Sequence, residues 1–541
     1  MIWRHRTLAA IIIVLAGVAA VLLGRGAQVA VQGAPSLTLD GRALTPGARE
    51  VSPRPSLGLL LPPGSVVGDF KAAIDGRSVL VLEAPGRAAR LDVGTLPQGS
   101  HHRLEVWRGA IGPARVGTVE VDFQVTEPLQ LAATWLATST QATVQVSASR
   151  ELADSGALQS ALARSGASVK RDDRGVEGRW PPGRTPAFTV PAGLRATTGA
   201  YLPADFSPAL GRVAGTTLSR VDLSQPLGPT PTGLRLRAYY LGGPAARTSL
   251  ARHAAKISVL SPAFYAADSD GTLLPSVDEP ALEMARAAGV SVEPLLTNRD
   301  FSATVARDLF RNAPAVDLLQ AALVTEAKRR GYAGYQLDFE GLGFGDRAAL
   351  TGFSAQLSRH LRDAGLKYST AVIPTKDPGG SGLIQIFGHS GVYDYRQLSR
   401  DAGSMSVMAY DQHTSATDPG PVAGLDWVRQ VTEATSAGVD RSRIFMGVPL
   451  YYRDWPLHGQ PTAGAYAEMV AAAADHDGTV SWDFSSQSPY VRYSAAGQEH
   501  VAWMENGTSL LAKMQVAHEM GFGGISAWRL GLEDPAFWDL W

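Results

Sequence analysis

The chain has 541 residues, and its 49 Lys and Arg side chains almost balance its 50 Asp and Glu side chains. This length suffices for about two to four domains, and the balanced charge argues against nucleic acid or an anionic membrane surface as a partner. Cysteine is absent, which excludes disulfides and thiolate metal sites.

The N-terminal segment, residues 1–30, predicts a route out of the cytoplasm. Arg4, His5 and Arg6 precede an apolar run over residues 8–23. A basic region before an apolar one is typical of a signal peptide, and an uncleaved segment would act as a signal anchor that contacts the membrane. Both alternatives stay open. Either one places the rest of the chain outside the cytoplasmic membrane, secreted or anchored.

Two β-rich modules are expected next, over residues 35–128 and 129–206. Short strand-like runs alternate with turn signals such as Asp75-Gly76. The spacing predicts an immunoglobulin-like β-sandwich for the first module and a second β-rich module after it. We interpret both as spacers that hold the C-terminal part away from the membrane, with glycan binding as the alternative. Residues 207–233, rich in Pro, Gly, Thr and Ser, predict a linker.

From residue 234 to residue 541, strand-like and helical segments alternate. Eight strands with intervening helices predict a (β/α)8 TIM barrel. The interval between the seventh and eighth strands is too long for one helix, so a small α+β insertion is expected at about residues 454–508. The expected strands are Leu234–Leu241, Ile257–Tyr265, Val290–Leu296, Tyr335–Glu340, Tyr368–Ile373, Ser406–Tyr410, Ile444–Leu450 and Gly524–Trp528.

The fourth expected strand carries the strongest chemical signal. Its polar and apolar residues alternate, so Gln336, Asp338 and Glu340 share one face. Two carboxylates one strand repeat apart lie about 6–7 Å apart at their Cα atoms, where like charges resist ionising together. A carboxylate beside a carboxylic acid can cleave a glycosidic bond. The alternative is an edge strand whose acidic side chains face water.

Other polar and aromatic residues follow the ends of barrel strands, where functional side chains of this fold gather. Tyr410 and Asp411 end the sixth expected strand, Tyr451 follows the seventh, and Trp528 ends the eighth. A tryptophan can stack on a sugar ring, so the set predicts a saccharide site, with core packing as the alternative for Tyr410 and Trp528. Asp411 and His413 lack the spacing of a metal motif, so no metal site is expected there.

Four motifs of this region, in the right order, resemble glycoside hydrolase family 18, the chitinase-like barrels. The resemblance covers about residues 234–541 and is strongest to the bacterial branch that acts on cell-wall or envelope polysaccharide. Ala333 and Gln336 depart from the family pattern D-G-x-D-x-D-x-E, which has aspartates there. The motifs are Tyr332-Ala333-Gly334-Tyr335-Gln336-Leu337-Asp338-Phe339-Glu340, Met408-Ala409-Tyr410-Asp411, Gly447-Val448-Pro449-Leu450-Tyr451 and Gly524-Ile525-Ser526-Ala527-Trp528.

The resemblance implies a glycoside hydrolase of β-linked N-acetylglucosamine polysaccharide, whether chitin-like, peptidoglycan or exopolysaccharide. It implies a retaining mechanism assisted by the substrate's acetamido group, without cofactor. Glu340 would be the acid and base, Asp338 would orient the acetamido group, and Tyr410 would hydrogen-bond to it. The residues implied to bind substrate are Gln336, Asp411, Tyr451, Trp528 and Tyr239.

Two other functions stay open. One is a catalytically weak or inactive chitinase-like lectin, since barrels of this family include carbohydrate-binding proteins. The other is an envelope scaffold in which the β-modules do the work. The expected partner is the polysaccharide, with no nucleic acid, and the chain is expected to be a monomer.

Overall fold

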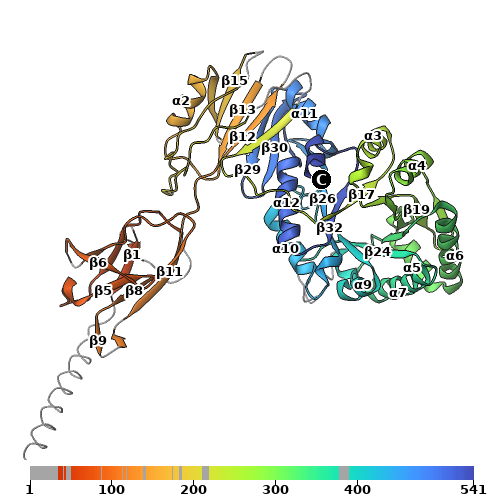
Figure 1. Cartoon of the computed structure of the whole chain (residues 1–541), viewed down its shortest axis with the longest axis horizontal. Helices are drawn as coiled ribbons and strands as arrows, with labels where there is room; N and C mark the ends of the chain where they lie inside the picture. Colours follow the sequence, from red (N-terminus) through yellow and green to blue (C-terminus); the bar gives the residue numbers. More distant parts are fainter. Residues whose placement is uncertain are drawn as a thin grey trace, which may run out of the picture. The chain divides into compact units, whose positions relative to one another are not determined.

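The computed structural model describes residues 35–541 with gaps at 40–41, 44–49, 87, 112–113, 117, 138–141, 173–174, 182–185, 210–217 and 377–388. The expected signal segment, residues 1–30, lies outside the described residues. The chain divides into two compact units (Figure 1). The N-terminal unit comprises residues up to Gln130, Arg150–Leu158 and Thr189–Phe206, and the C-terminal unit comprises the remainder. Across the described ranges, no helix combines the length and hydropathy that a membrane span needs.

The N-terminal unit is built from a nine-stranded sheet with the order β2-β1-β4-β7-β6-β5-β8-β11-β3. Its strands alternate buried and exposed residues, as in β11, where Val121, Phe123 and Val125 join the apolar core. A β-rich module was expected here, and its immunoglobulin-like type stays a prediction. The strands are β1 Ser36–Leu39, β2 Arg42–Ala43, β3 Glu50–Val51, β4 Leu57–Leu60, β5 Lys71–Ile74, β6 Arg77–Ala84, β7 Ala88–Asp92, β8 His101–Trp107 and β11 Val119–Val125, with a hairpin of β9 Gly109–Ile111 and β10 Ala114–Val116 and a 3-10 turn η1 Val67–Asp69.

A second sheet of five antiparallel strands belongs to the C-terminal unit, with the order β14-β15-β13-β12-β16. Its last strand corrects the expected linker at residues 207–233, because Leu218–Leu223 forms β16. Its last four residues, 220–223, alternate polar and apolar side chains, a short strand signal enclosed by Pro- and Gly-rich sequence. The other elements are β12 Leu131–Ala137, β13 Ala142–Ala148, α2 Gly156–Arg164, β14 Ser168–Asp172 and β15 Gly175–Trp180.

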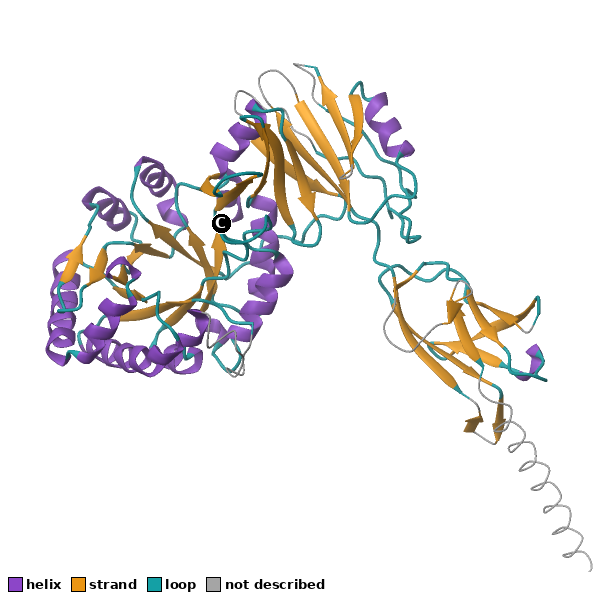
Figure 2. Ribbon diagram, turned by 180° about the vertical axis from the view of Figure 1, so that it is seen from behind, coloured by secondary structure: helices purple, strands orange, loops and turns teal. Residues whose placement is uncertain are grey.

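The main body of the C-terminal unit is a TIM-barrel-like ring of parallel strands surrounded by helices (Figure 2). The ring closes because β17 pairs with both β18 and β32. Each of the eight expected ranges overlaps a parallel strand, and the second and third strands are each interrupted once. The sixth strand ends at Val407, three residues before Tyr410, where the sequence had placed its end. In order they are β17 Arg235–Tyr240, β18 Val259–Pro262 with β19 Tyr265–Ala267, β21 Ser291–Val292 with β22 Leu295–Asn298, β23 Gly334–Asp338, β24 Lys367–Val372, β25 Ser404–Val407, β26 Ile444–Pro449 and β32 Gly524–Trp528.

Helices connect the barrel strands and cover their outer faces. The turn after α6 shows how the sequence places β23: Gly331 has φ 66°, a left-handed conformation that suits glycine and ends the helix. The helices are α3 Pro244–His253, α4 Glu279–Ala287, α5 Ala303–Arg311, α6 Ala313–Arg330, α7 Arg347–Asp363, α9 Tyr395–Asp401, α10 Leu425–Thr435 and α12 Gly507–Glu519. Shorter pieces are η2 Ala254–Lys256, β20 Leu273–Pro275, η3 Arg299–Phe301, η4 Phe344–Asp346, η5 His389–Val392, η6 Arg441–Arg443 and η7 Pro535–Leu540.

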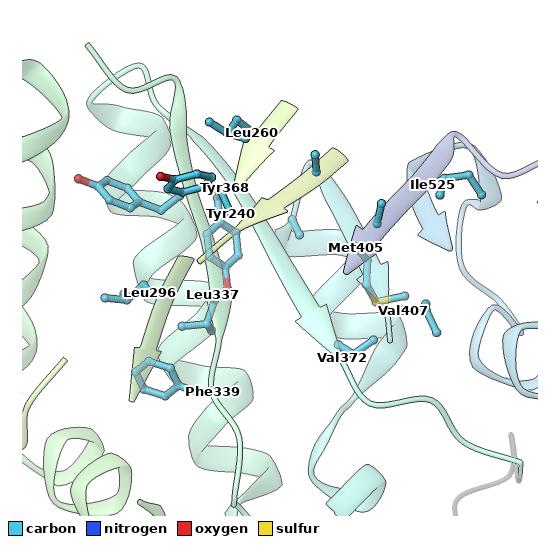
Figure 3. Packing of buried hydrophobic residues seen from close by; sticks show 14 of the residues in the cluster. Tyr240, Leu260, Leu296, Leu337, Phe339, Tyr368, Val372, Met405, Val407 and Ile525 are labelled. Atoms are coloured by element: carbon cyan, nitrogen blue, oxygen red, sulfur yellow. The ribbon is translucent and has the colours of Figure 1, made fainter. Parts of the chain in front are cut away.

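The barrel strands separate apolar and polar side chains between their two faces. Tyr335, Leu337 and Phe339 of the β23 segment lie in the apolar layer under the helices, and Figure 3 shows Leu337 and Phe339 there. The opposite face of β23 carries Gln336 and Asp338, both buried. The expected two-residue alternation is therefore confirmed, and the edge-strand alternative is wrong, because β23 pairs with β22 and with β24.

The expected insertion lies between β26 and β32 and forms its own antiparallel sheet, with the order β28-β27-β31-β30-β29. It packs on the second sheet: Leu136 of β12 joins the apolar cluster of the insertion, and Thr479 Oγ1 donates to Glu177 Oε2 at 3.1 Å. Most of the expected second module, residues 131–149 and 159–188, therefore belongs to the C-terminal unit, and its strand β12 shares a core with the insertion. Its role as a spacer stays a prediction. The elements are β27 Tyr451–Pro456, β28 Thr462–Ala465, α11 Tyr466–Asp475, β29 Thr479–Asp483, β30 Ser488–Ala495 and β31 Gln498–Trp503.

Candidate active site

The end of β23 places two carboxyl groups at the mouth of the barrel. Asp338 is the last residue of the strand and only 4% exposed, while Glu340, two residues on, is half-buried. Burial, reinforced by the charge of Glu340, raises the pKa of Asp338 well above its usual range. Burial also raises the pKa of Glu340, with the charge of Asp411 adding to it and His389 opposing it. Both groups therefore favour the protonated form more than ordinary carboxyl groups do.

The backbone of Glu340 is fixed by Asn298 at the end of β22. Glu340 N–H donates to Asn298 Oδ1 at 3.0 Å, and Asn298 Nδ2 donates back to the Glu340 carbonyl at 3.0 Å. The next residue, Gly341, has φ 76°, and a Cβ there would lie 2.2 Å from the Phe301 carbonyl oxygen. Only glycine fits this turn. Asn298 was not expected from the sequence, although it is a polar residue just beyond the third expected strand.

Asp411 is held at the rim by residues from the start of the insertion. Its φ of 59° is a left-handed conformation that aspartate tolerates better than most residues. Asp411 Oδ1 accepts from Tyr451 Oη at 2.6 Å and from Arg453 Nη2 at 2.6 Å. The structure thus joins the expected residues Asp411 and Tyr451. Arg453 was not expected, because nothing in the sequence brings it to the sixth strand.

Three aromatic side chains line the same end of the barrel. The Trp528 ring centroid lies 5.2 Å from that of Tyr239 and 6.4 Å from that of Tyr410. Gly447 on β26 leaves room for this arrangement, since a Cβ there would lie 2.9 Å from Tyr410 Cε1. Burial raises the pKa of the Tyr410 phenol well above its usual range, so the phenol stays a hydrogen-bond donor.

The structure brings all eight sequence-predicted residues to one end of the barrel. Gln336 lies beneath Asp338 on β23, wholly buried, and its Nε2 donates to Ser406 Oγ at 3.0 Å. In the described part of the chain, neither Asp338 nor Glu340 forms an ion pair, and no group of three or more His, Asp or Glu side chains could hold a metal. The site therefore offers proton transfer by two unpaired carboxyl groups beside aromatic surfaces.

A TIM-barrel-like fold with a carboxyl pair at its fourth strand and a tryptophan at its eighth defines a class of barrel proteins with an acid–base site. The sequence points to a particular family: residues 298–533 match the model of Glycosyl hydrolases family 18.

Several known proteins are similar to the chain. YdhD of Bacillus subtilis (strain 168), whose name describes a sporulation-specific glycosylase, is 33% identical over 242 residues, which are 44% of this chain and 56% of that protein. The cortical fragment-lytic enzyme of Bacillus anthracis is 28% identical over 291 residues, covering 51% of this chain and 65% of the enzyme. The matched region thus spans less than two thirds of either relative.

A solved structure extends the likeness to the fold. A chitinase from Chromobacterium violaceum ATCC 12472 superposes with a TM-score of 0.53 and 28% identity, covering 57% of this chain and 97% of the chitinase. Nearly the whole of that protein is therefore matched by little more than half of this chain.

Proposed function

We propose that the protein is a glycoside hydrolase that cleaves β-linked N-acetylglucosamine polysaccharide of the cell-wall type. The observation that carries this proposal is the pair of Asp338 and Glu340 at the mouth of the barrel, two carboxyl groups of raised pKa that form no ion pair with any of the described residues. The names of the relatives, a glycosylase and a cortical fragment-lytic enzyme, support the substrate class.

The proposed first step breaks the glycosidic bond with help from the substrate. Glu340 donates its proton to the glycosidic oxygen, while the acetamido oxygen of the same sugar attacks the anomeric carbon and forms an oxazolinium ion. Asp338 accepts the acetamido N–H, and the Tyr410 phenol donates to the acetamido oxygen. Trp528 supports the apolar face of the reacting sugar. This substrate-assisted course differs from a scheme with two enzyme carboxylates.

The second step returns the proton. Glu340, now a carboxylate, takes a proton from a water that attacks the anomeric carbon, and the acetamido group is restored. Two displacements at one carbon retain the configuration. The raised pKa of Glu340 serves both steps, since the acid must hold its proton near neutral pH and regain it afterwards.

The deciding experiment incubates the full chain with chitin oligosaccharides, peptidoglycan and a fully de-N-acetylated polymer, with products read by mass spectrometry. We expect cleavage of the acetylated glycans and none of the de-N-acetylated polymer, which lacks the internal nucleophile. Equal cleavage of all three would contradict the mechanism. Binding of the oligosaccharides with no product on long incubation would instead identify a lectin.

The proposal also fixes where the protein acts and what it meets. A cell-wall polysaccharide lies outside the cytoplasmic membrane, so we propose an extracytoplasmic protein, secreted or anchored by its N-terminal segment. Fractionation of producing cells tests this, and recovery in the cytoplasm alone would refute it.

A further inference from the structure

The N-terminal unit contains a pocket of about 570 Å³ that the proposed reaction does not use. One side is formed by Ser52 and Arg54, between β3 and β4, and by Thr95, which follows β7. Another side is the loop that carries Arg195 and Tyr201. All the lining residues belong to this one compact unit, and the volume lies within the range of sites for small molecules.

Hydrogen bonds and close packing hold the two sides of the pocket together. Gln98 Oε1 accepts from the Tyr201 N–H at 2.9 Å, and Gln98 Nε2 donates to the Tyr201 carbonyl at 3.2 Å. Gly199 has φ 83°, and a Cβ there would lie 2.9 Å from Ser52 Cβ, so only glycine allows this approach. The pocket is therefore a fixed part of the unit.

The pocket carries positive charge that is not balanced by a paired acid. Among the described residues that line it, Arg54 and Arg195 are the charged ones, and neither forms an ion pair with any described residue. Another arginine of the same unit, Arg150, is paired, with its Nη1 2.9 Å from Glu50 Oε2. Asp205, close in sequence to the lining loop, accepts from a backbone N–H of that loop at 2.8 Å. A bound anion would supply the counter-charge that the pocket lacks.

Both guanidinium groups are placed to meet such an anion. Arg54 Nε donates to Thr95 Oγ1 at 3.0 Å, which orients the remaining N–H groups of the fork. The Arg195 guanidinium carbon lies 5.9 Å from the centroid of the Tyr201 ring. The planar guanidinium matches the oxygens of a carboxylate or a phosphate, and the half-buried tyrosine ring adds apolar surface beside the charge. This combination suits an anionic group carried on a sugar.

We propose that this pocket binds an oxyanion carried on a cell-wall glycan, with Arg54 and Arg195 pairing with it. The choice of a cell-wall glycan rests on the proposed function, whereas the choice of an oxyanion rests on the pocket alone. The carboxylate of N-acetylmuramic acid and the phosphate of a polyol-phosphate polymer share this chemistry. Binding here keeps the protein on the wall polymer while the barrel cleaves it.

Isothermal titration calorimetry of the full chain tests the pocket with three soluble probes. N-acetylmuramic acid and glycerol phosphate carry the oxyanion, and N-acetylglucosamine lacks it. We expect at least one anionic probe to bind, and its affinity to fall about tenfold in Arg54→Met and in Arg195→Met, since each loses a charge-assisted hydrogen bond. The anionic probe that binds more tightly identifies the source as carboxylate or phosphate. N-acetylglucosamine should show no binding that depends on these arginines.

Arg77→Met is the matched control, because Arg77 is exposed on β6 of the same unit and does not line the pocket. It removes the same charge and should leave the affinity unchanged. No binding of either anionic probe, or an affinity that stays unchanged in both pocket variants, would overturn the proposal. An equal loss in Arg77→Met would overturn it as well, since it would reflect net charge alone. If one pocket variant does not fold, the other decides.

Separate measurements distinguish this inference from the proposed function. Cleavage of soluble chitin oligosaccharides should be unchanged in Arg54→Met, since Arg54 belongs to the N-terminal unit and Glu340 to the C-terminal unit. Arginine-dependent binding with no cleavage by the unaltered chain supports the pocket and refutes the hydrolase. Cleavage without arginine-dependent binding supports the hydrolase and refutes the pocket.

Discussion

The barrel interior contains buried ionisable side chains at two levels along its axis, and they differ in whether they are paired with an opposite charge. Toward the N-terminal ends of the strands, Arg237 is 1% exposed and its Nη2 donates to Glu293 Oε2 at 2.7 Å. Ser261 and Ser404 accept from the same guanidinium. At the mouth, Asp338 and Glu340 form no ion pair with any residue in the described ranges. A buried charge that is paired and hydrogen-bonded is structural, whereas a buried carboxyl without a partner prefers its proton and can transfer it.

We expect the largest effect from removing the proton donor at the mouth of the barrel. Glu340→Gln removes the proton donor and should lower kcat on N-acetylglucosamine oligosaccharides by about 10²–10⁴-fold, the usual contribution of general acid catalysis. Steady-state kinetics measures it. Glu433→Gln, an exposed change on α10, is the control and should keep full turnover. Unchanged turnover in Glu340→Gln would remove that residue from the mechanism.

We expect the next largest effect from breaking the buried ion pair of Arg237 and Glu293. Arg237→Met removes the nearer cation of the buried Glu293 and leaves only Lys367 Nζ at 3.9 Å, so it should cost at most about 3–5 kcal/mol of unfolding free energy. Urea denaturation measures the loss. The double variant Arg237→Met/Glu293→Gln should recover most of it, because no uncompensated charge remains. Arg429→Met, which breaks an exposed pair with Glu519, should cost under about 1 kcal/mol. Equal losses in Arg237→Met and Arg429→Met would show that the buried pair is not special.

A third variant tests the unpaired state of Asp338 through the pH dependence of the unfolding free energy. Asp338 has a higher pKa folded than unfolded, so it contributes stability only while protonated, and this contribution is lost as pH rises from the unfolded value through the raised one. Asp338→Asn carries no such proton. Its unfolding free energy relative to the unaltered chain should therefore increase with pH over that window, as urea titrations at several pH values would show. Asp363→Asn, at the exposed end of α7, controls for the lost charge. A difference that does not change with pH would contradict the unpaired state of Asp338.

We expect the smallest effect from a variant that changes the pKa of Glu340 and leaves its carboxyl group in place. The charge of Asp411 helps to raise the pKa of Glu340, so Asp411→Asn should lower that pKa. Because the acid must be protonated, the alkaline limb of the kcat/KM profile should move to lower pH. A limb that stays in place would show that burial alone sets the proton affinity of Glu340.

The strands and the carboxyl pair could be predicted because both depend on local patterns. Each barrel strand is a short apolar run between stop signals, and the alternation over Gln336, Asp338 and Glu340 assigns faces without knowledge of the fold. The second and third strands could not be seen to break, since their interruptions arise from pairing with neighbours on both sides.

The partners of the site residues could not be predicted for a related reason. Asn298 holds Glu340 from 42 positions away, and Arg453 reaches Asp411 from 42 positions away. Neither contact has a sequence signature, because each exists only once the barrel closes and the insertion begins. Strand β16 was missed because its four alternating residues, 220–223, carry less weight than the Pro and Gly around them.

The packing of the second sheet on the insertion has a practical consequence for dissecting the chain. A fragment starting at residue 234 would contain every catalytic candidate, yet it would expose apolar surface of the insertion that Leu136, Ala132 and Val221 normally cover. Such a fragment invites aggregation for reasons unrelated to the chemistry. The second sheet thus covers apolar surface of the insertion between β26 and β32. We therefore expect that the second sheet and the insertion can be transferred to another protein only together.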